Sequence, residues 1–313
     1  MIKNKNKNKN EEAYLDLLRE LVSLSREAND NHHPHRPDRT GTGTISVFAR
    51  QLRFDLVQGK IPFLTTKTLA WKTVLRELLW FFKGKPDVRL LEKNNVRIWS
   101  ANASREFLDE RGLKNYEEGD VGPLYPFSFR HFGANYQGCD KDYTDQGLDQ
   151  LQKLIQGLEK EPYSRRHVIT TFNPAVVDDC ALPPCHGISI QFYLSHLTHG
   201  LSCHVVCRSS DVFLGLPFNI ASYGFFVHIV AKKLSKTFPD IFADELVVST
   251  GDTHLYLNHI HQAEQQISRC PFDPPTLLIK DDVIDLPWES IGEEHFEIID
   301  YIRHPPLLAA MAI

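Results

Sequence analysis

One cysteine in this chain follows two prolines and precedes a histidine. In the run Ala181-Leu-Pro-Pro-Cys-His-Gly187, the thiol of Cys185 lies next to the imidazole of His186. Because proline fixes φ at about −65° and has no N–H, Pro183 and Pro184 stiffen the approach to Cys185 and keep it out of a β ladder. A thiol held in a rigid turn before a strand is well placed to act as a nucleophile. The alternative is a free cysteine that only packs beside a histidine.

A second candidate is a carboxyl group inside an apolar helix. The sequence pattern predicts a helix from Thr68 to Phe82, stopped by Gly84, with Glu77 among aromatic and aliphatic neighbours. Burial disfavours the charged form of a carboxyl group and so raises its pKa, which makes Glu77 a candidate proton carrier near neutral pH. The alternative is a surface glutamate paired with Arg76 or Lys83.

Two segments contain residue types that bind anions and line pockets. The loop Asp38-Arg-Thr-Gly-Thr-Gly-Thr44 combines Arg39 with two glycines that let backbone N–H groups approach an anion. A plain hairpin explains the same loop equally well. The run from Arg208 to Asn219 places an arginine, a serine, an aspartate and an asparagine in a mostly apolar segment, which is typical of a pocket wall.

Two other polar clusters are weaker indications. Arg165 and Arg166 directly precede a predicted strand, and successive strand residues point to opposite faces, so one arginine could reach a partner chain. A solvated pair is the alternative. His32, His33 and His35 could bind a metal, but they lie in a proline-rich loop without a nearby thiol or carboxylate, so we expect a solvated loop and no metal site there.

The elements that must position these residues follow from periodicity and turn residues. The predicted helices are 11–26, 68–82, 148–158, 220–238 and one opened by 251–256, and the predicted strands are 45–57, 168–172, 188–194, 201–207, 276–280 and 296–301. Neither a repeat nor a clear linker divides the chain. The pattern predicts an α/β protein of the α+β type, in which one large domain (residues 11–313) has a mixed β-sheet flanked by helices.

Composition excludes several classes of protein. The 313 residues carry a net charge of −5, which does not support RNA binding. A membrane span is not expected, because no apolar run reaches the roughly 18 residues that one needs. Residues 1–10 alternate lysine and asparagine, which predicts a disordered polar tail rather than a secretory signal. The six cysteines lack a C-x-x-C pair, so we expect reduced thiols and a cytoplasmic protein, with nuclear import as the alternative.

In their order along the chain, nine motifs resemble those of thymidylate synthases. They are Asp38–Thr44, Glu77–Phe81, Ile98-Trp99, Gly122–Tyr125, Arg165-Arg166, Pro183–His186, Arg208-Ser209-x-Asp211, Phe218–Tyr223 and Gly251–Tyr256. The insertion from Ser104 to Asp120 resembles the branch found in eukaryotes and large viruses. The chain departs from the family pattern at Ser100, Pro126, Ser128, Phe129, Phe172 and Cys207, where the family usually has Asp, Gly, Gln, Trp, Trp and Gln.

The resemblance implies reductive methylation of dUMP by the cosubstrate 5,10-methylenetetrahydrofolate, without a metal. Cys185 would add to C6 of the uracil, Glu77 would organise the waters that remove the C5 proton, and Arg208 would lower the pKa of the thiol. The implied catalytic residues are Cys185, Glu77, Tyr125, His186 and Asp211. The implied dUMP-binding residues are Arg39, Arg208, Ser209, Asn219, His254 and Tyr256, with Arg165 and Arg166 from the other subunit of a homodimer. Those on the folate side are Trp99, Asp211, Leu214, Gly215, Phe218 and Ile313. The sheet face is the expected dimer interface.

Three other functions are compatible with parts of this pattern. A hydroxymethyltransferase of the same superfamily would use water instead of hydride in its last step. A weakly active or inactive homologue could act as a dimeric nucleotide- or RNA-binding protein. A cysteine hydrolase based on Cys185 and His186 is disfavoured, because adjacent side chains in an extended segment point apart.

Overall fold

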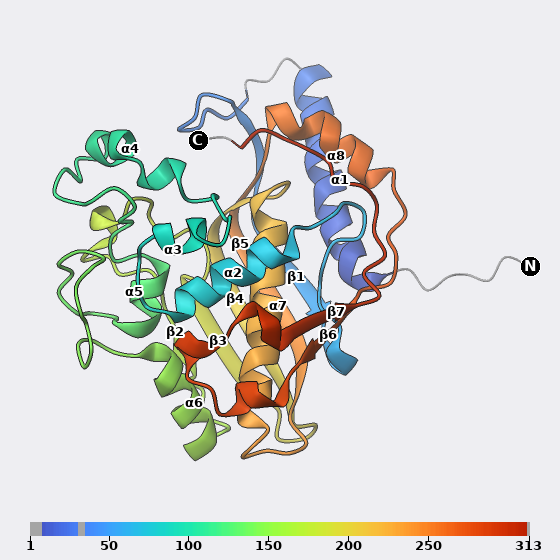
Figure 1. Cartoon of the computed structure of the whole chain (residues 1–313). Helices are drawn as coiled ribbons and strands as arrows, with labels where there is room; N and C mark the ends of the chain where they lie inside the picture. Colours follow the sequence, from blue (N-terminus) through green and yellow to red (C-terminus); the bar gives the residue numbers. More distant parts are fainter. Residues whose placement is uncertain (1–7, 31–34, 312–313) are drawn as a thin grey trace, which may run out of the picture.

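The architecture centres on a five-stranded mixed sheet (Figure 1). We describe residues 8–30 and 35–311 in a computed structural model of the chain. The strands are β1 (Thr44–Asp55), β2 (Val168–Ile169), β3 (Ser189–Leu194), β4 (Gly200–Asp211) and β5 (Phe242–Tyr256). Their order is β1-β5-β4-β3-β2, and only β4 and β5 among these neighbours run parallel. A small second sheet pairs β6 (Thr276–Ile279) with β7 (Phe296–Ile299).

Helices of very different lengths flank the large sheet. The α-helices are α1 (Lys9–Asp30), α2 (Trp71–Phe82), α3 (Arg89–Glu92), α4 (Arg105–Glu110), α5 (Tyr125–Arg130), α6 (Gln150–Lys160), α7 (Gly215–Leu234) and α8 (Ile260–Ile267). Short 3₁₀ turns are Val57–Gly59, Ala101–Ala103, Val177–Asp179, Leu257–His259, Asp281–Ile284, Trp288–Ser290 and Glu293–His295. None of the described helices combines the length and apolar character that crossing a lipid bilayer requires.

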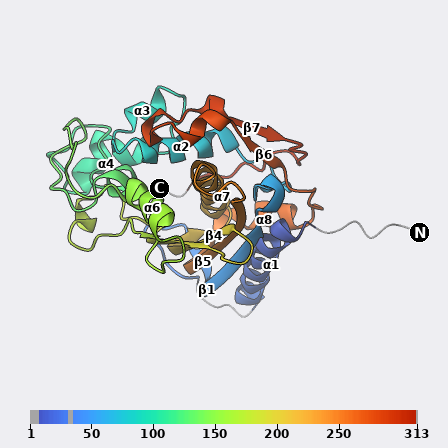
Figure 2. The same cartoon turned by 90° about the horizontal axis from the view of Figure 1, so that it is seen from below.

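Helix α7 forms the centre of the core. It packs between the sheet and α2, as the view from below shows (Figure 2). Because its residues are apolar on nearly every side, burial on all sides is the arrangement that removes them from water. Its Phe226 ring lies 5.5 Å from the ring of Phe82, 5.8 Å from Phe129 and 5.3 Å from Phe192. One aromatic side chain thus joins α2, α5 and β3.

The opposite face of the sheet stays accessible in the described chain. Along β4, alternate residues such as His204 and Val206 are half-buried, while their neighbours are fully buried. On the same face, Tyr193 is 59% exposed and Val168 is 45% exposed. A sheet face that mixes apolar and polar side chains at partial exposure is suited to covering by another surface.

The fold class predicted from the sequence is confirmed, but one predicted helix is wrong. Gly251–Tyr256 does not open a helix; it is the end of β5, where His254 pairs with Ser46 of β1 and with Asp211 of β4. Asp252 looks like a helix cap, yet its carboxylate binds His254 and Arg36 instead. The hydrogen bonds of two neighbouring strands outweigh this local capping signal.

Several boundaries also differ from the prediction. The expected loop 208–219 is divided between the end of β4 and the first turns of α7, and the expected strand 168–172 is only two residues long. Lys9 and Asn10 belong to α1 rather than to a disordered tail, because the Asn8 side chain caps this helix by accepting the N–H of Glu11 at 3.3 Å. Residues 1–7, His32, His33 and Ile313 lie outside the described residues.

The first prediction concerns Glu11, which attaches α1 to the body of the protein. This buried carboxylate accepts the N–H groups of Thr65 at 2.8 Å and Thr66 at 2.7 Å, and also both threonine hydroxyls. Glu11→Ala leaves two buried N–H groups unpaired, so it should cost about 2–4 kcal/mol of stability and lower the melting temperature by about 5–10 °C. The adjacent Glu12→Ala removes only a partly exposed ion pair with Arg19 and serves as the control. Equal melting temperatures for the two variants would contradict the assignment.

Candidate active site

The turn that carries Cys185 is held by one arginine of β4. Arg208 donates from Nε to the carbonyl of Pro184 at 2.7 Å and from Nη2 to that of Pro183 at 2.9 Å. Its backbone N–H donates to the carbonyl of Cys185 at 2.9 Å. Gly187 completes the turn with φ +60°, where a Cβ would lie 2.1 Å from the Tyr223 hydroxyl. Only glycine fits there, and the half-buried thiol is fixed at the start of β3.

A tyrosine hydroxyl lies against the thiol. The hydroxyl of Tyr125 accepts the N–H of Cys185 at 2.9 Å, and the same oxygen is 3.6 Å from Sγ of Cys185. Tyr125 is the first residue of α5, and Pro126 fits into the first helical turn, where its missing N–H leaves no carbonyl unpaired. The side chain is buried, and its ring packs against Phe81 of α2 at 5.0 Å.

Burial, rather than Arg208, dominates the ionisation of the thiol. Burial raises the pKa of Cys185, and the hydrogen bond with Tyr125 and the charge of Arg208 only partly offset this rise. The expectation that Arg208 lowers the pKa of the thiol is confirmed, but burial acts in the opposite direction and has the larger effect. The thiol is therefore mainly protonated near neutral pH.

Glu77 is buried, as the sequence predicted. Its side chain is 9% exposed, and Oε1 accepts the indole N–H of Trp99 at 2.7 Å. Burial raises the pKa of this carboxyl group to about 7, although the Trp99 hydrogen bond acts in the opposite direction. Arg76, offered as a surface partner, instead binds Glu293 at 2.6 Å. Glu77 can thus hold or release a proton near neutral pH.

The contacts of His186 do not suit it to act as the base of a thiol hydrolase. Its ring stacks on Tyr125 with centroids 4.3 Å apart, and Nδ1 is 2.8 Å from the hydroxyl of Tyr223. Burial lowers the pKa of His186 to about 3, so the ring is neutral. The residue supports Tyr125 and Tyr223 in the wall beside Cys185.

The carboxylate of Asp211 organises the start of α7. It accepts the N–H groups of Phe213 at 3.0 Å and Leu214 at 3.3 Å. Lys67 lies over the Phe213 ring with Nζ 3.6 Å from the centroid, and it also donates to the Phe213 carbonyl. Burial lowers the pKa of Lys67 to about 7, against the opposing charge of Asp211. The sequence reasoning missed Lys67, whose only signal is a lysine within an otherwise uncharged segment.

Other predicted binding residues lie near the ends of β4 and β5. His254 is paired with Asp211 in the sheet, its Nδ1 is 2.9 Å from Asp252, and its ring is 5.2 Å from that of Tyr256. Arg39 is exposed in the turn 38–43, which Asp38 closes. Four predicted residues are half-buried in β4 or in the first turns of α7: Ser209, Gly215, Phe218 and Asn219.

Two predicted residues lie apart from this group within the chain. Arg166 binds Glu161 at 3.0 Å, and its side chain is 82% exposed. The carbonyl of Arg165 accepts the side-chain amide of Gln191 at 3.3 Å, in the middle of β3, whereas Cys185 precedes that strand. A cavity of about 350 Å³ between α6 and β2 includes Arg166 and none of the residues around Cys185.

Four of the departures from the family pattern are buried or bound to other parts of the chain. Cys207 is fully buried, and burial raises its pKa to about 12. Phe129 stacks on Phe81 with centroids 6.0 Å apart. Ser128 donates its hydroxyl to the carbonyl of Pro123 at 3.1 Å, and Ser100 donates to Glu92. These side chains have partners of their own, so the site is packed around them.

Comparison with known proteins identifies the family. Residues 12–313 match the family model described as thymidylate synthase. The chain belongs to the thymidylate synthase family. It is 44% identical to the thymidylate synthase of Saccharomyces cerevisiae, over 99% of this chain and 98% of the relative. The Candida albicans thymidylate synthase is 42% identical over 97% and 98%, and the Homo sapiens thymidylate synthase is 42% identical over 89% and 85%.

The second prediction tests the contact between Tyr125 and Cys185. Tyr125→Phe removes the hydroxyl that favours the thiolate, so the pKa of Cys185 should rise further and its alkylation by iodoacetamide at about pH 8 should slow severalfold. Mass mapping of both labelled peptides gives the rate, and the exposed Cys270 provides an internal reference whose rate should not change. Equal labelling rates of Cys185 in the two proteins would refute this contact.

Proposed function

We propose that this chain is a thymidylate synthase, which converts dUMP and 5,10-methylenetetrahydrofolate into dTMP and dihydrofolate. The observation that carries the proposal is the placement of Cys185 and Glu77 in one site, joined through Tyr125 and Trp99. The two rings lie 6.1 Å apart; Tyr125 contacts the thiol, and Trp99 binds the carboxyl group. A nucleophile and a proton carrier with a pKa of about 7 are the two groups that methylation of a pyrimidine carbon needs.

In the proposed mechanism, the thiolate of Cys185 forms a bond with C6 of the uracil, which makes C5 nucleophilic. The folate cosubstrate supplies the one-carbon unit and the hydride. Glu77 accepts the proton that leaves C5, through waters that its carboxylate orients. The bond between the one-carbon unit and the folate nitrogen then breaks, which leaves an exocyclic methylene on C5. Hydride addition to that carbon restores the C5–C6 double bond and expels Cys185 as the thiolate. Because the pKa of Glu77 is about 7, the group can accept and return a proton in each cycle near neutral pH.

The residues around the strand ends provide the binding groups for dUMP. Guanidinium groups suit a phosphate because they donate parallel hydrogen bonds, and an amide side chain can serve both N3–H and O4 of uracil. In our proposal Arg39, Arg208 and Ser209 bind the phosphate, Asn219 binds the uracil, and His254 and Tyr256 bind the deoxyribose hydroxyl. The pairing of Asp211 with His254 in the sheet supports this assignment, because it brings the end of β5 next to the end of β4, shortly before α7.

We assign folate binding to residues that leave apolar surface for a planar ring. Trp99, Leu214 and Phe218 are half-buried, so they leave apolar surface that a planar ring can cover. Asp211 adds a carboxylate next to them, and Gly215 allows close approach at the first turn of α7. We assign Ile313 to the same set from the family resemblance alone.

A homodimer would give Arg165 and Arg166 a role in binding the nucleotide. The accessible sheet face, with Tyr193 and Val168 exposed, supports an interface there. Arg165 and Arg166 lie apart from Cys185 of their own chain, which supports a role at the phosphate of the neighbouring subunit. We also propose a cytoplasmic location, because the spacing of the six cysteines does not match a secreted disulfide framework.

The third prediction tests the reaction and its nucleophile. Purified protein with dUMP and 5,10-methylenetetrahydrofolate should give dTMP, identified by mass, together with dihydrofolate. Cys185→Ser should abolish both turnover and the covalent adduct with 5-fluoro-dUMP. Formation of hydroxymethyl-dUMP would instead identify a hydroxymethyltransferase, and an adduct in Cys185→Ser would exclude this cysteine as the nucleophile. Failure of the wild type to form any product would exclude the proposed reaction.

The fourth prediction tests whether subunits share sites. Cys185→Ala and Arg165→Ala should each be inactive alone. After subunit exchange, a mixed dimer contains one site with both native residues, so about half of its sites regain activity. Native mass spectrometry establishes that exchange has occurred. Mixing either variant with itself is the control, and an inactive mixture of proven heterodimers would disprove sharing.

A further inference from the structure

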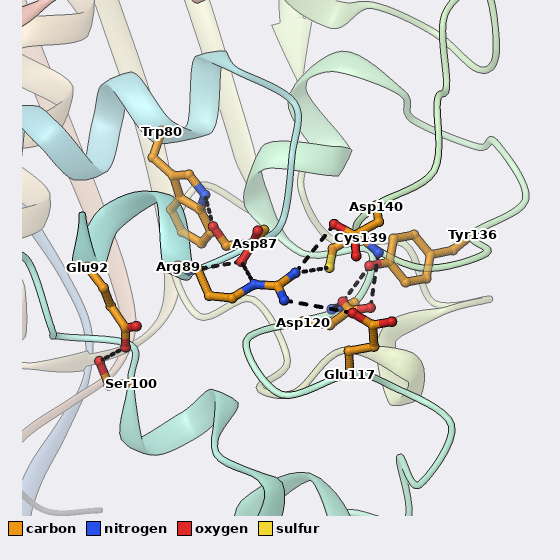
Figure 3. Close-up of polar contacts among 11 residues, drawn as sticks. Trp80, Asp87, Arg89, Glu92, Ser100, Glu117, Asp120, Tyr136, Cys139 and Asp140 are labelled. Carbon is orange, nitrogen blue, oxygen red and sulfur yellow. Dashed lines mark hydrogen bonds and ion pairs between the residues drawn. The ribbon is translucent and has the colours of Figure 1, made fainter. Parts of the chain in front are cut away.

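A guanidinium group fixes the first residue of α3 to three loops. Arg89 binds Asp87 through Nε at 2.8 Å, while its other nitrogens lie 3.3 Å from Asp140 and 3.8 Å from Glu117 (Figure 3). Its Nη2 is also 3.6 Å from Sγ of Cys139. Asp87, Cys139 and Asp140 have the donor atoms of a metal site, but Arg89 already occupies the space among them. The cluster is therefore an anchor for α3.

The last residue of α3 is fixed to the segment that carries Trp99. Glu92 accepts the hydroxyl of Ser100, the residue that follows Trp99 in the chain (Figure 3). Ser100 is one of the departures from the family pattern. Its short side chain reaches Glu92 across the turn, so the pair determines where the Trp99 backbone lies.

A second route leads from Arg89 to the same indole. The carboxylate that binds Arg89 belongs to Asp87, whose carbonyl accepts the indole N–H of Trp80 at 3.1 Å. The ring of Trp80 packs against that of Trp99, with centroids 6.1 Å apart. Trp99 in turn donates to Oε1 of Glu77 at 2.7 Å. Contacts from both ends of the four-residue helix α3 thus lead to the hydrogen bond between Trp99 and Glu77.

We propose that α3 braces Trp99 against Glu77 from both ends, so that Arg89 and Glu92 are positioning residues for the proton carrier of the proposed reaction. Neither residue touches the thiol or the carboxyl group of the site. Their effect is to keep the indole N–H within hydrogen-bonding distance of Glu77. Because that bond favours the carboxylate, loosening the brace should make Glu77 harder to ionise.

Two titratable groups from other elements interact with Glu77, and both are neutral near neutral pH. Cys185, in the turn before β3, interacts electrostatically with it, and burial raises the pKa of this thiol. Tyr223 of α7 also interacts with Glu77, and burial raises the pKa of its hydroxyl well above the ordinary value. On α2 itself, Arg76 is bound to Glu293. The Trp99 bond is therefore the contact through which the brace can act.

An NMR titration tests the brace without turnover. Protein labelled with ¹⁵N at the tryptophan indoles gives four signals, and Trp99→Phe identifies the one from Trp99. In the wild type this signal should titrate with a midpoint of about 7 as Glu77 ionises. Glu92→Ala and Arg89→Ala should each raise the midpoint by roughly half to one pH unit, the effect of weakening one hydrogen bond.

Two control variants separate positioning from general damage. Glu92→Gln keeps an acceptor for Ser100 and should restore the wild-type midpoint. Arg50→Ala removes a guanidinium of β1 that is 36% exposed and bound to Glu20 of α1, and it should leave the midpoint unchanged. If Glu92→Ala does not fold, Ser100→Ala removes only the hydroxyl and should shift the midpoint in the same direction. Unchanged midpoints in folded brace variants would overturn the proposal, as would a Trp99 signal that does not titrate between about pH 5 and 9.

Kinetics provide the second readout. The acid limb of the kcat profile should move to higher pH in the brace variants, with KM for dUMP unchanged, because neither Arg89 nor Glu92 is a proposed nucleotide-binding residue. A rise in KM without a shift of the pH profile would overturn the positioning role. If the wild type makes no dTMP, the proposed function fails, while the NMR midpoints still decide whether the brace exists.

Discussion

The parallel pairing of β4 with β5 is the constraint on which the rest of the structure depends. Parallel neighbours need a crossover, and here the crossover is α7, which must lie on the sheet and bury its apolar surface there. The register of this pair joins Asp211 to His254, and a slip of one residue would turn His254 to the other face. The same strand holds the turn of Cys185 through Arg208. The sheet register, the burial of α7 and the position of Cys185 therefore depend on one another.

Burial shifts the pKa values of the titratable groups of the site so that the neutral form of each is favoured. It raises the pKa of Glu77 to about 7 and lowers that of His186 to about 3. It also lowers the pKa of Lys67 to about 7 and raises that of Cys185. Acids and bases alike are pushed toward their neutral forms, because a low-dielectric interior penalises any charge.

Local signals in the sequence predicted the parts of the site that depend on neighbouring residues. The stiff turn at Cys185 and the burial of Glu77 follow from prolines and helical periodicity. The structure at Asp252 was predicted wrongly, because a capping residue and a strand residue look alike until the partner strands are known. The roles of Lys67 and Arg89 are not evident from the sequence for a related reason. Their partners come from distant segments, as in the contact of Arg89 with Asp140. Long-range contacts decide these cases, and a single sequence does not display them.

The contacts of Arg208 connect its proposed phosphate-binding role to the position of Cys185. The guanidinium group that is proposed to receive the phosphate already holds the carbonyls of Pro183 and Pro184, directly before Cys185. A phosphate bound to Arg208 would thus restrict the motion of the Cys185 sulfur through a single side chain. Binding energy from the phosphate, which does not react, would then orient the sulfur toward the reacting carbon. An analogue without the phosphate would then lose reactivity as well as affinity, since the thiol would sample a wider range of approach directions.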